Sequence, residues 1–365
     1  MRGLAWRNFD FLLFGAVVLA SAFGAMMIRS AIAGNTDLAG YDTRQAYFAA
    51  AGVVVIVLLA SIDYHYWISI HWPIYIVTML FLMSLSGLGQ AAFGAQRWFQ
   101  VGVLFVQPTE FAKIVVILAL ARYFERSRHD PRNTRWLLKS LAWALGLAVW
   151  ILLQPNLSNV IVIVVLWISM VWMNGVRVRQ IAMMALAGLI LAVVAFPFLE
   201  PYQQARVVNF AIPDPEARTG ATYNVLQALI AIGSGGLFGK GYGHGPQTQL
   251  RFLKVRHTDF IFSATAEEFG MIGAILIVIL EALVIYRCLR AAQKARDISG
   301  AMLAFGVAML VFFQSATNIA VNLRLIPVSG LPLPFVSYGG SGLMALMIGV
   351  GLAESVVMRH RELEF

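Results

Sequence analysis

The chain has 365 residues, of which 60% are hydrophobic and 12% charged, and its formal net charge is +9. Soluble domains carry about 25% charged residues, so this composition excludes an ordinary soluble protein and indicates a polytopic membrane protein. The basic residues stand in short clusters between apolar runs, which is typical of membrane topology and not of a nucleic-acid-binding face. The single cysteine, Cys288, excludes an internal disulfide and a thiolate metal cluster.

Apolar segments taken in chain order predict the membrane spans. A span needs about 20 residues at a rise of about 1.5 Å each. We expect ten transmembrane helices, at residues 9–29, 45–62, 72–90, 109–124, 136–153, 158–174, 179–199, 259–286, 302–321 and 336–358. Because the first run is long enough to span, we expect no cleavable signal peptide. The predicted fold is all-α, with a single membrane domain over residues 1–365.

The distribution of arginine and lysine predicts the orientation. One set of connections holds most of these residues, while the short connections on the other side hold only Arg29, Arg44, Arg97 and Arg324. Cytoplasmic connections carry the excess of positive charge, so both termini are expected in the cytoplasm. The connection at about 200–258, between helices seven and eight, is then a large extracytoplasmic loop.

Asp259 is the first candidate for chemistry. It stands in the run His257-Thr258-Asp259, where a polar loop enters the eighth span. An ionised side chain at that depth is costly unless it faces a wet cavity or a partner. The sequence leaves two interpretations open: Asp259 is a chemical centre, or Thr258 or Asp259 simply caps the following helix.

Glu110 and Lys113 form a second candidate pair at the start of the fourth span. They are three residues apart and therefore share a helix face. The helix dipole favours an anion at Glu110, in the first turn. The pair is either a structural ion pair between spans or a charged lining for a substrate cavity.

The glycine-rich run 233–243 is not a nucleotide loop, because Lys240 is followed by glycine and not by Ser or Thr. It either holds an anionic head group near Lys240 through backbone N–H groups, or lets two backbones pack closely. In the run 327–341, three prolines forbid a continuous helix. There Ser337 and Ser341 could donate hydrogen bonds to a head group, or Gly339 and Gly340 could serve packing alone.

The loop residues near Asp259 bear on metal binding. His244 and His257 are thirteen residues apart on a loop, and with Asp259 they do not have the ligand spacing of a structural zinc site. A hard divalent cation, Mg²⁺ or Mn²⁺, held by Asp259 together with a substrate diphosphate fits the residues better. No cofactor or metal site built from protein residues alone is predicted.

These pieces together resemble the SEDS family (shape, elongation, division and sporulation), which includes RodA, FtsW and SpoVE. The matching segments are the Gly-Ala-x-Arg-Trp run ending at Trp98, 107–113, 202–206, 231–236, 257–262 with Glu267-Glu268, and 332–341. The resemblance implies ten helices and a peptidoglycan glycosyltransferase that polymerises lipid II at the bacterial inner membrane. It also implies contact with membrane lipids and a class B penicillin-binding protein as partner. The run 239–250 is similar to the loop of the RodA branch, which implies a role in cell elongation and shape.

Carried over by motif, the essential aspartate of the family falls on Asp259, and the paired acid and lysine fall on Glu110 and Lys113. The cavity residues fall on Arg97 and Trp98, and the loop arginine on Arg206. Lys240, His257, Thr258, Ser337 and Ser341 complete the expected substrate-binding set. The chain departs from the family at Asn156, where an aspartate is usual, and at 253–256, where the approach to Asp259 is more basic.

The resemblance implies an inverting reaction in which Asp259 accepts a proton from the attacking hydroxyl. A departing diphosphate needs cationic help, from Lys113, Arg97, Arg206 or a divalent ion. Three alternatives stay open at this point: a transporter that flips lipid II, a scaffold without chemistry, and a division or sporulation paralogue.

Overall fold

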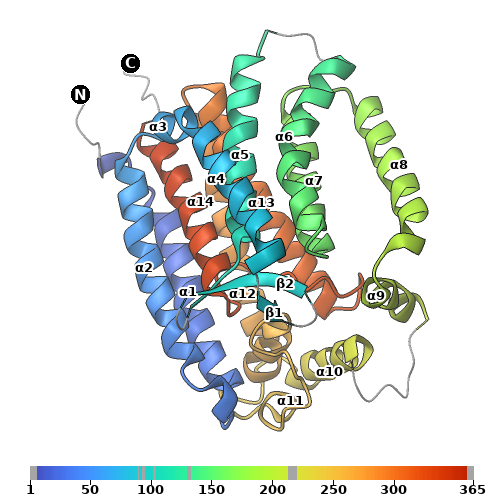
Figure 1. Ribbon diagram of the computed structural model, residues 1–365. Helices are drawn as coiled ribbons and strands as arrows, with labels where there is room; N and C mark the ends of the chain where they lie inside the picture. Colours follow the sequence, from blue (N-terminus) through green and yellow to red (C-terminus); the bar gives the residue numbers. More distant parts are fainter. Residues whose placement is uncertain are drawn as a thin grey trace.

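The computed structural model describes residues 6–88, 90–92, 95–101, 104–129, 133–212 and 220–359, without the side chains of residues 86–92, 95–98, 100–101, 104, 192 and 221. Long helices packed side by side form most of the molecule (Figure 1). They are α1 (Phe11–Ala31), α2 (Tyr41–Ser61), α4 (His71–Leu88), α5 (Pro108–Arg126), α6 (Thr134–Leu152), α7 (Leu157–Met173), α8 (Val178–Ala195), α12 (Ile261–Lys294), α13 (Ile298–Asn322) and α14 (Gly340–Met358).

Seven helices in the described residues are long and apolar enough to cross a membrane, namely α1, α2, α6, α8, α12, α13 and α14. Helix α7 and the part of α4 with described side chains, His71–Leu85, are apolar but shorter. The chain is therefore a mostly helical, multi-pass membrane protein. Each of the segments expected from the sequence overlaps one of the long helices, and the count of ten membrane spans stays a prediction.

Short elements connect the long helices. The helical ones are η1 (Trp6–Asn8), η2 (Thr36–Leu38), α3 (Tyr64–Ser69), η3 (Phe196–Phe198), α9 (Pro201–Ala211), α10 (Gly220–Gly235) and α11 (Pro246–Gln249). A small antiparallel sheet, in the order β1 (Gln90–Ala92), β2 (Ala95–Val101) and β3 (Leu104–Val106), adds strands to the predicted all-α fold. Its place is the connection between α4 and α5, where hydropathy alone predicts no element.

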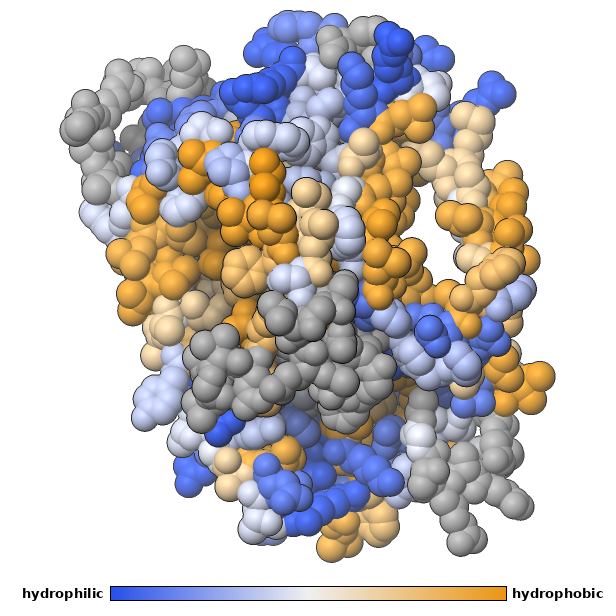
Figure 2. Space-filling view, in the orientation of Figure 1, coloured by the Kyte–Doolittle hydropathy of each residue, from blue (hydrophilic) through white to orange (hydrophobic). Residues whose placement is uncertain are grey.

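The two ends of the molecule differ. Both termini lie at one end of the bundle, and α9, α10 and α11 lie at the other (Figure 1). Figure 2 shows an apolar belt between two polar ends. Among the seven candidate spans α13 and α14 are the most enclosed, with 67% and 78% of their apolar windows buried, whereas the described side chains of the α8 window are 0% buried. Helix α8 thus stands at the edge of the bundle.

The eighth predicted span, residues 259–286, is interrupted near its start. Gly270, with φ 65° and ψ −159°, breaks α12 after a first segment of residues 261–269. The glycine run packs against this break: a β-carbon on Gly239 would lie 2.1 Å from the carbonyl oxygen of Glu268. The Lys240 and Gly241 N–H groups donate to the carbonyls of Glu267 and Glu268, each at 2.9 Å. The close-packing interpretation of the run is therefore confirmed, because only glycine permits this approach.

Candidate active site

Asp259 lies in the turn before α12, half-buried, and its main chain is held by two asparagines of α13. The Asp259 carbonyl accepts hydrogen bonds from Nδ2 of Asn318 at 3.0 Å and from Nδ2 of Asn322 at 2.9 Å. Asn322 Oδ1 in turn accepts from the Ser263 N–H at 3.1 Å. The cap position of α12 is Phe260, and no side chain caps it. The helix-cap interpretation of Asp259 is therefore wrong, and its carboxylate is left for other contacts.

Arg206 of α9 faces the same point as the Asp259 carboxylate. A β-carbon on Gly330 would lie 3.8 Å from Asp259 Oδ2 and 4.0 Å from each terminal nitrogen of Arg206. Arg206 Nη1 also donates to the Ser329 carbonyl at 3.3 Å. Aspartate and arginine thus flank one glycine, and among the described residues they form no direct ion pair with each other. An anion and a cation are presented to a shared space.

The two titratable side chains of this turn, Asp259 and His257, have pKa values shifted in opposite directions. Burial raises the pKa of Asp259 to about 6, against the opposing effects of the Arg206 charge and the Thr258 hydroxyl. Burial and the nearby Arg256 charge lower the pKa of His257 to about 4. Near neutral pH Asp259 is therefore ionised and able to accept a proton, while His257 is uncharged.

The C-terminal loop before α14 is bonded to the Asp259 turn. Ser337 Oγ donates to the Thr258 carbonyl at 2.7 Å and accepts from the Leu333 N–H at 2.9 Å. The Tyr338 N–H donates to the His257 carbonyl at 2.9 Å. The hydroxyl of Ser337 thus fixes the main chain beside Asp259. Its expected role as a substrate ligand, like those of His257 and Thr258, stays a prediction.

The Glu110–Lys113 pair is formed and enclosed. Lys113 Nζ lies 2.7 Å from Glu110 Oε2, with the two residues 1% and 5% exposed. A β-carbon on Gly342 would lie 3.3 Å from Glu110 Oε2. Next to it, Ser341 Oγ accepts from the Gln107 N–H at 3.0 Å and donates to the Phe105 carbonyl at 2.9 Å. The first turn of α14 therefore packs on the first turn of α5.

One connection links the two charged groups. It leaves α13, passes Asp259 at Gly330 and ends at α14, whose first turn reaches Glu110 at Gly342. The side chains of Arg97 and Trp98, on β2, lie outside the described residues. Lys240 has an exposed side chain, and in the described structure no contact joins it to Asp259. Among the described residues no three His, Cys, Asp or Glu side chains converge as a metal site, and a divalent ion shared with a substrate stays a prediction.

Sequence reasoning missed the residues that orient the site. Asn318 also donates to the Leu331 carbonyl at 2.9 Å, so it joins the Asp259 turn to the C-terminal loop. Ser158 Oγ donates to the Ser329 carbonyl, the same oxygen that Arg206 reaches. The sequence does mark the two asparagines. Their side-chain amides are four residues apart and share a face of an apolar helix, where burying a polar group costs free energy unless it is hydrogen-bonded.

Comparison with known proteins gives concordant results. A family model described as "Cell cycle protein", of the FtsW/RodA/SpoVE type, matches residues 6–362. The chain is 35% identical over 351 residues to the peptidoglycan glycosyltransferase MrdB of Escherichia coli (strain K12), covering 93% of this chain and 92% of that protein. It is similar to the rod shape determining protein RodA of Thermus thermophilus, with a TM-score of 0.72, 29% identity, and coverage of 98% and 99% of the two chains.

A chain from a solved structure described as "Structural coordination of polymerization and crosslinking by a peptidoglycan synthase complex" has a TM-score of 0.80 and 29% identity, covering 96% of this chain and 97% of that one. The family match, the identity to MrdB and the structural similarity all extend over nearly the full chain. The chain belongs to the FtsW/RodA/SpoVE family of cell cycle proteins.

Proposed function

We propose that this protein is a peptidoglycan glycosyltransferase that polymerises lipid II into β-1,4-linked glycan strands. The carrying observation is that Asp259 and Arg206 lie on either side of Gly330, which places a proton acceptor beside a cation. The activity named for MrdB, over 92% of that protein's length, supports the same conclusion.

The chemistry needs one base and one site for a departing anion. The donor sugar is linked α to a polyprenyl diphosphate, and the acceptor is the 4-hydroxyl of another glycan unit. The acceptor oxygen bonds to the anomeric carbon as its proton passes to the Asp259 carboxylate. The bond from that carbon to the diphosphate oxygen breaks, and the diphosphate leaves with the electron pair, which inverts the configuration. Arg206 stabilises the charge that develops on the leaving oxygen.

The Glu110–Lys113 pair has a supporting place in this proposal. Lys113 is held by Glu110 at 2.7 Å inside the bundle, where an unpaired charge is costly. Glu110 packs against the first turn of α14, so the pair suits a charged wall at the end of the connection that passes Asp259 at Gly330. Arg97 and Trp98 belong to this proposal through the family resemblance alone, since their side chains lie outside the described residues.

We propose ten membrane spans with both termini in the cytoplasm of a bacterial inner membrane. The shared end of the termini and the basic residues on that end support this orientation (Figure 1). Helices α9–α11 then lie outside, where lipid II is polymerised without a nucleotide. The partner would be a class B penicillin-binding protein that cross-links the glycan, in keeping with the coordination of polymerization and crosslinking described for the similar synthase complex.

A second candidate function is transport of lipid II across the membrane. The break of α12 at Gly270 favours it, because broken helices are common at transporter binding sites. Incubating the purified protein with lipid II in detergent separates the two functions, because no membrane remains to be crossed. Glycan chains seen on a gel support the polymerase. Lipid II that stays monomeric, with and without a cross-linking partner, would contradict it.

A further inference from the structure

A basic cavity lies at the end of the bundle that carries both termini, far along α12 from Asp259. Its volume is about 290 Å³. Four of its lining residues are basic and one is acidic: Arg7, Arg287, Arg290, Lys294 and Asp10. It opens where three candidate spans end, since α1 begins at Phe11, α12 ends at Lys294 and α14 ends at Met358. The cavity therefore stands at a boundary between apolar belt and water.

The one carboxylate that lines the cavity, that of Asp10, already has ion-pair and hydrogen-bond partners. Asp10 Oδ2 lies 2.6 Å from Arg287 Nε and 2.5 Å from Arg287 Nη2, a two-point ion pair. Its Oδ1 accepts from the Leu12 and Leu13 N–H groups at 3.2 and 3.1 Å, which caps α1. Asp10 thus neutralises Arg287, and it makes no ion pair with Arg290 or Lys294.

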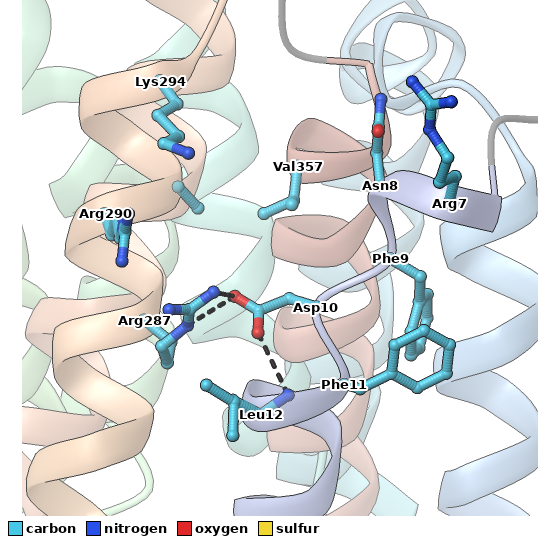
Figure 3. Close-up of a pocket in the computed structure, with 11 residues that line it drawn as sticks. Arg7, Asn8, Phe9, Asp10, Phe11, Leu12, Arg287, Arg290, Lys294 and Val357 are labelled. Carbon is cyan, nitrogen blue, oxygen red and sulfur yellow. Dashed lines mark hydrogen bonds and ion pairs between the residues drawn. The ribbon is translucent and has the colours of Figure 1, made fainter.

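Arg290 and Lys294 supply the uncompensated charge. With Arg287 they follow a spacing of three and four residues, which places them on one face of α12. Figure 3 shows them on that helix, opposite Arg7 and Asn8. Among the described residues neither Arg290 nor Lys294 has an ion-pair or hydrogen-bond partner, and both are exposed. Guanidinium and ammonium groups arranged in this way suit the oxygens of a phosphate group.

The floor of the cavity is apolar. Phe9, Ala291 and Val357 line it, and Phe11 and Leu12 are 69% and 61% exposed at the start of α1. Figure 3 shows the exposed Leu12 below Arg287, Arg290 and Lys294, an order that matches a phospholipid, with its phosphate above its acyl chains. Basic pockets between membrane helices are suited to anionic lipid head groups.

We propose that this cavity binds a phosphate-bearing anion, with Arg290 and Lys294 as the groups that hold the phosphate. The apolar floor favours an anionic phospholipid over free phosphate as the source. This site is distinct from the Asp259 site and does not depend on the proposed glycosyltransferase activity.

Native mass spectrometry of the full chain in detergent tests the proposal. The probes are dioleoyl phosphatidylglycerol, dioleoyl phosphatidylcholine and inorganic phosphate. We expect one phosphatidylglycerol molecule to bind with a preference over phosphatidylcholine. The double variant Arg290→Gln with Lys294→Gln should weaken that binding about 30-fold, at about 1 kcal/mol per charge and 1.4 kcal/mol per tenfold.

The matched control removes two charges elsewhere on the same end. Arg177→Gln with Arg179→Gln changes two exposed residues outside the cavity and should leave binding unchanged. The charge-preserving pair Arg290→Lys with Lys294→Arg should retain it, which separates loss of charge from loss of folding. Millimolar inorganic phosphate that displaces the lipid would identify free phosphate as a ligand of the same site. Equal binding of the two lipids to the wild type, or an equal loss in the control, would overturn the proposal.

Discussion

The side-chain amide of Asn322 donates to the main-chain carbonyl of Asp259 at 2.9 Å, and its Oδ1 accepts from the Ser263 N–H at 3.1 Å. One buried side chain thus bridges the turn that carries the carboxylate and the first turn of α12. Asn318, one helical turn earlier, adds a bond to the Asp259 carbonyl at 3.0 Å. The direction of the carboxylate therefore depends on α13, although neither asparagine touches the reacting atoms in the proposed mechanism.

Asn322→Leu should reduce polymerisation strongly. The substitution leaves the Ser263 N–H without its partner and removes one donor to Asp259, at a cost of about 1–3 kcal/mol for an unsatisfied buried group. We expect the turnover number to fall at least tenfold while the apparent affinity for lipid II changes little. Gln314→Leu on the same helix is the matched control, because the buried Gln314 amide has no hydrogen-bond partner within the described residues. Equal loss in both variants would mean general damage to α13.

Asp259→Asn should abolish polymerisation without unfolding the protein. The amide keeps the shape of the side chain but cannot accept the hydroxyl proton, and a general base contributes about 10²- to 10⁴-fold. The measurement is the rate of lipid II polymerisation together with the thermal unfolding midpoint. Asp37→Asn, an exposed residue in the short connection between α1 and α2, should be fully active. Turnover at the wild-type rate in the Asp259 variant would refute its role as base.

Activity should fall as the pH drops through about 6. Because burial raises the pKa of Asp259 to about 6, acid conditions protonate the base, and kcat/KM should decline about tenfold per pH unit below that value. Arg206 lowers this pKa, so Arg206→Gln should move the acid limb to higher pH as well as slow the reaction. Arg324 lines the same small pocket as Arg206, and Arg324→Gln should leave the pH dependence of kcat/KM unchanged. If the pH dependence of kcat/KM in the Arg206 variant matched that of the wild type, the Arg206 charge would have no effect on the pKa of Asp259.

The Glu110–Lys113 pair allows structure and chemistry to be separated. Lys113→Met strands a buried carboxylate, and breaking such a pair costs about 3–5 kcal/mol. Adding Glu110→Gln removes that charge, so the double variant should recover most of the thermal stability. We expect polymerisation to stay low in the double variant, because the cation is still missing. Full activity there would assign the pair a purely structural role.

Gly270→Ala should destabilise the protein. The backbone angles at Gly270 lie in a region open essentially only to glycine, which costs other residues about 1–3 kcal/mol. A β-carbon would also lie 2.4 Å from both the Gly239 nitrogen and the Leu237 carbonyl oxygen. Gly188→Ala in α8, where a β-carbon meets nothing within 4 Å, should be neutral in the same thermal unfolding assay. A wild-type midpoint for the Gly270 variant would contradict the close packing of the break.

The sequence by itself determined the membrane class, the positions of the long helices and the importance of Asp259, Glu110 and Lys113 as candidates. These features are local, because about 20 apolar residues or a charge within them can be recognised without knowing the fold. The glycine run was also recognised, but its two interpretations stayed open. Only the contacts of Gly239 and its neighbours with the main chain at Glu267, Glu268 and Gly270 decided between them.

The tertiary structure alone decided what surrounds the carboxylate. Arg206 and the Ser329 carbonyl are 123 residues apart in sequence, and Asn322 and Asp259 are 63 apart. Such pairs form because the packing of α9 and α13 brings distant loops to one point, and no pattern of hydropathy or spacing encodes that distance. The basic cavity arises in the same way, since Asp10 meets Arg287 across 277 residues when α1 packs on α12.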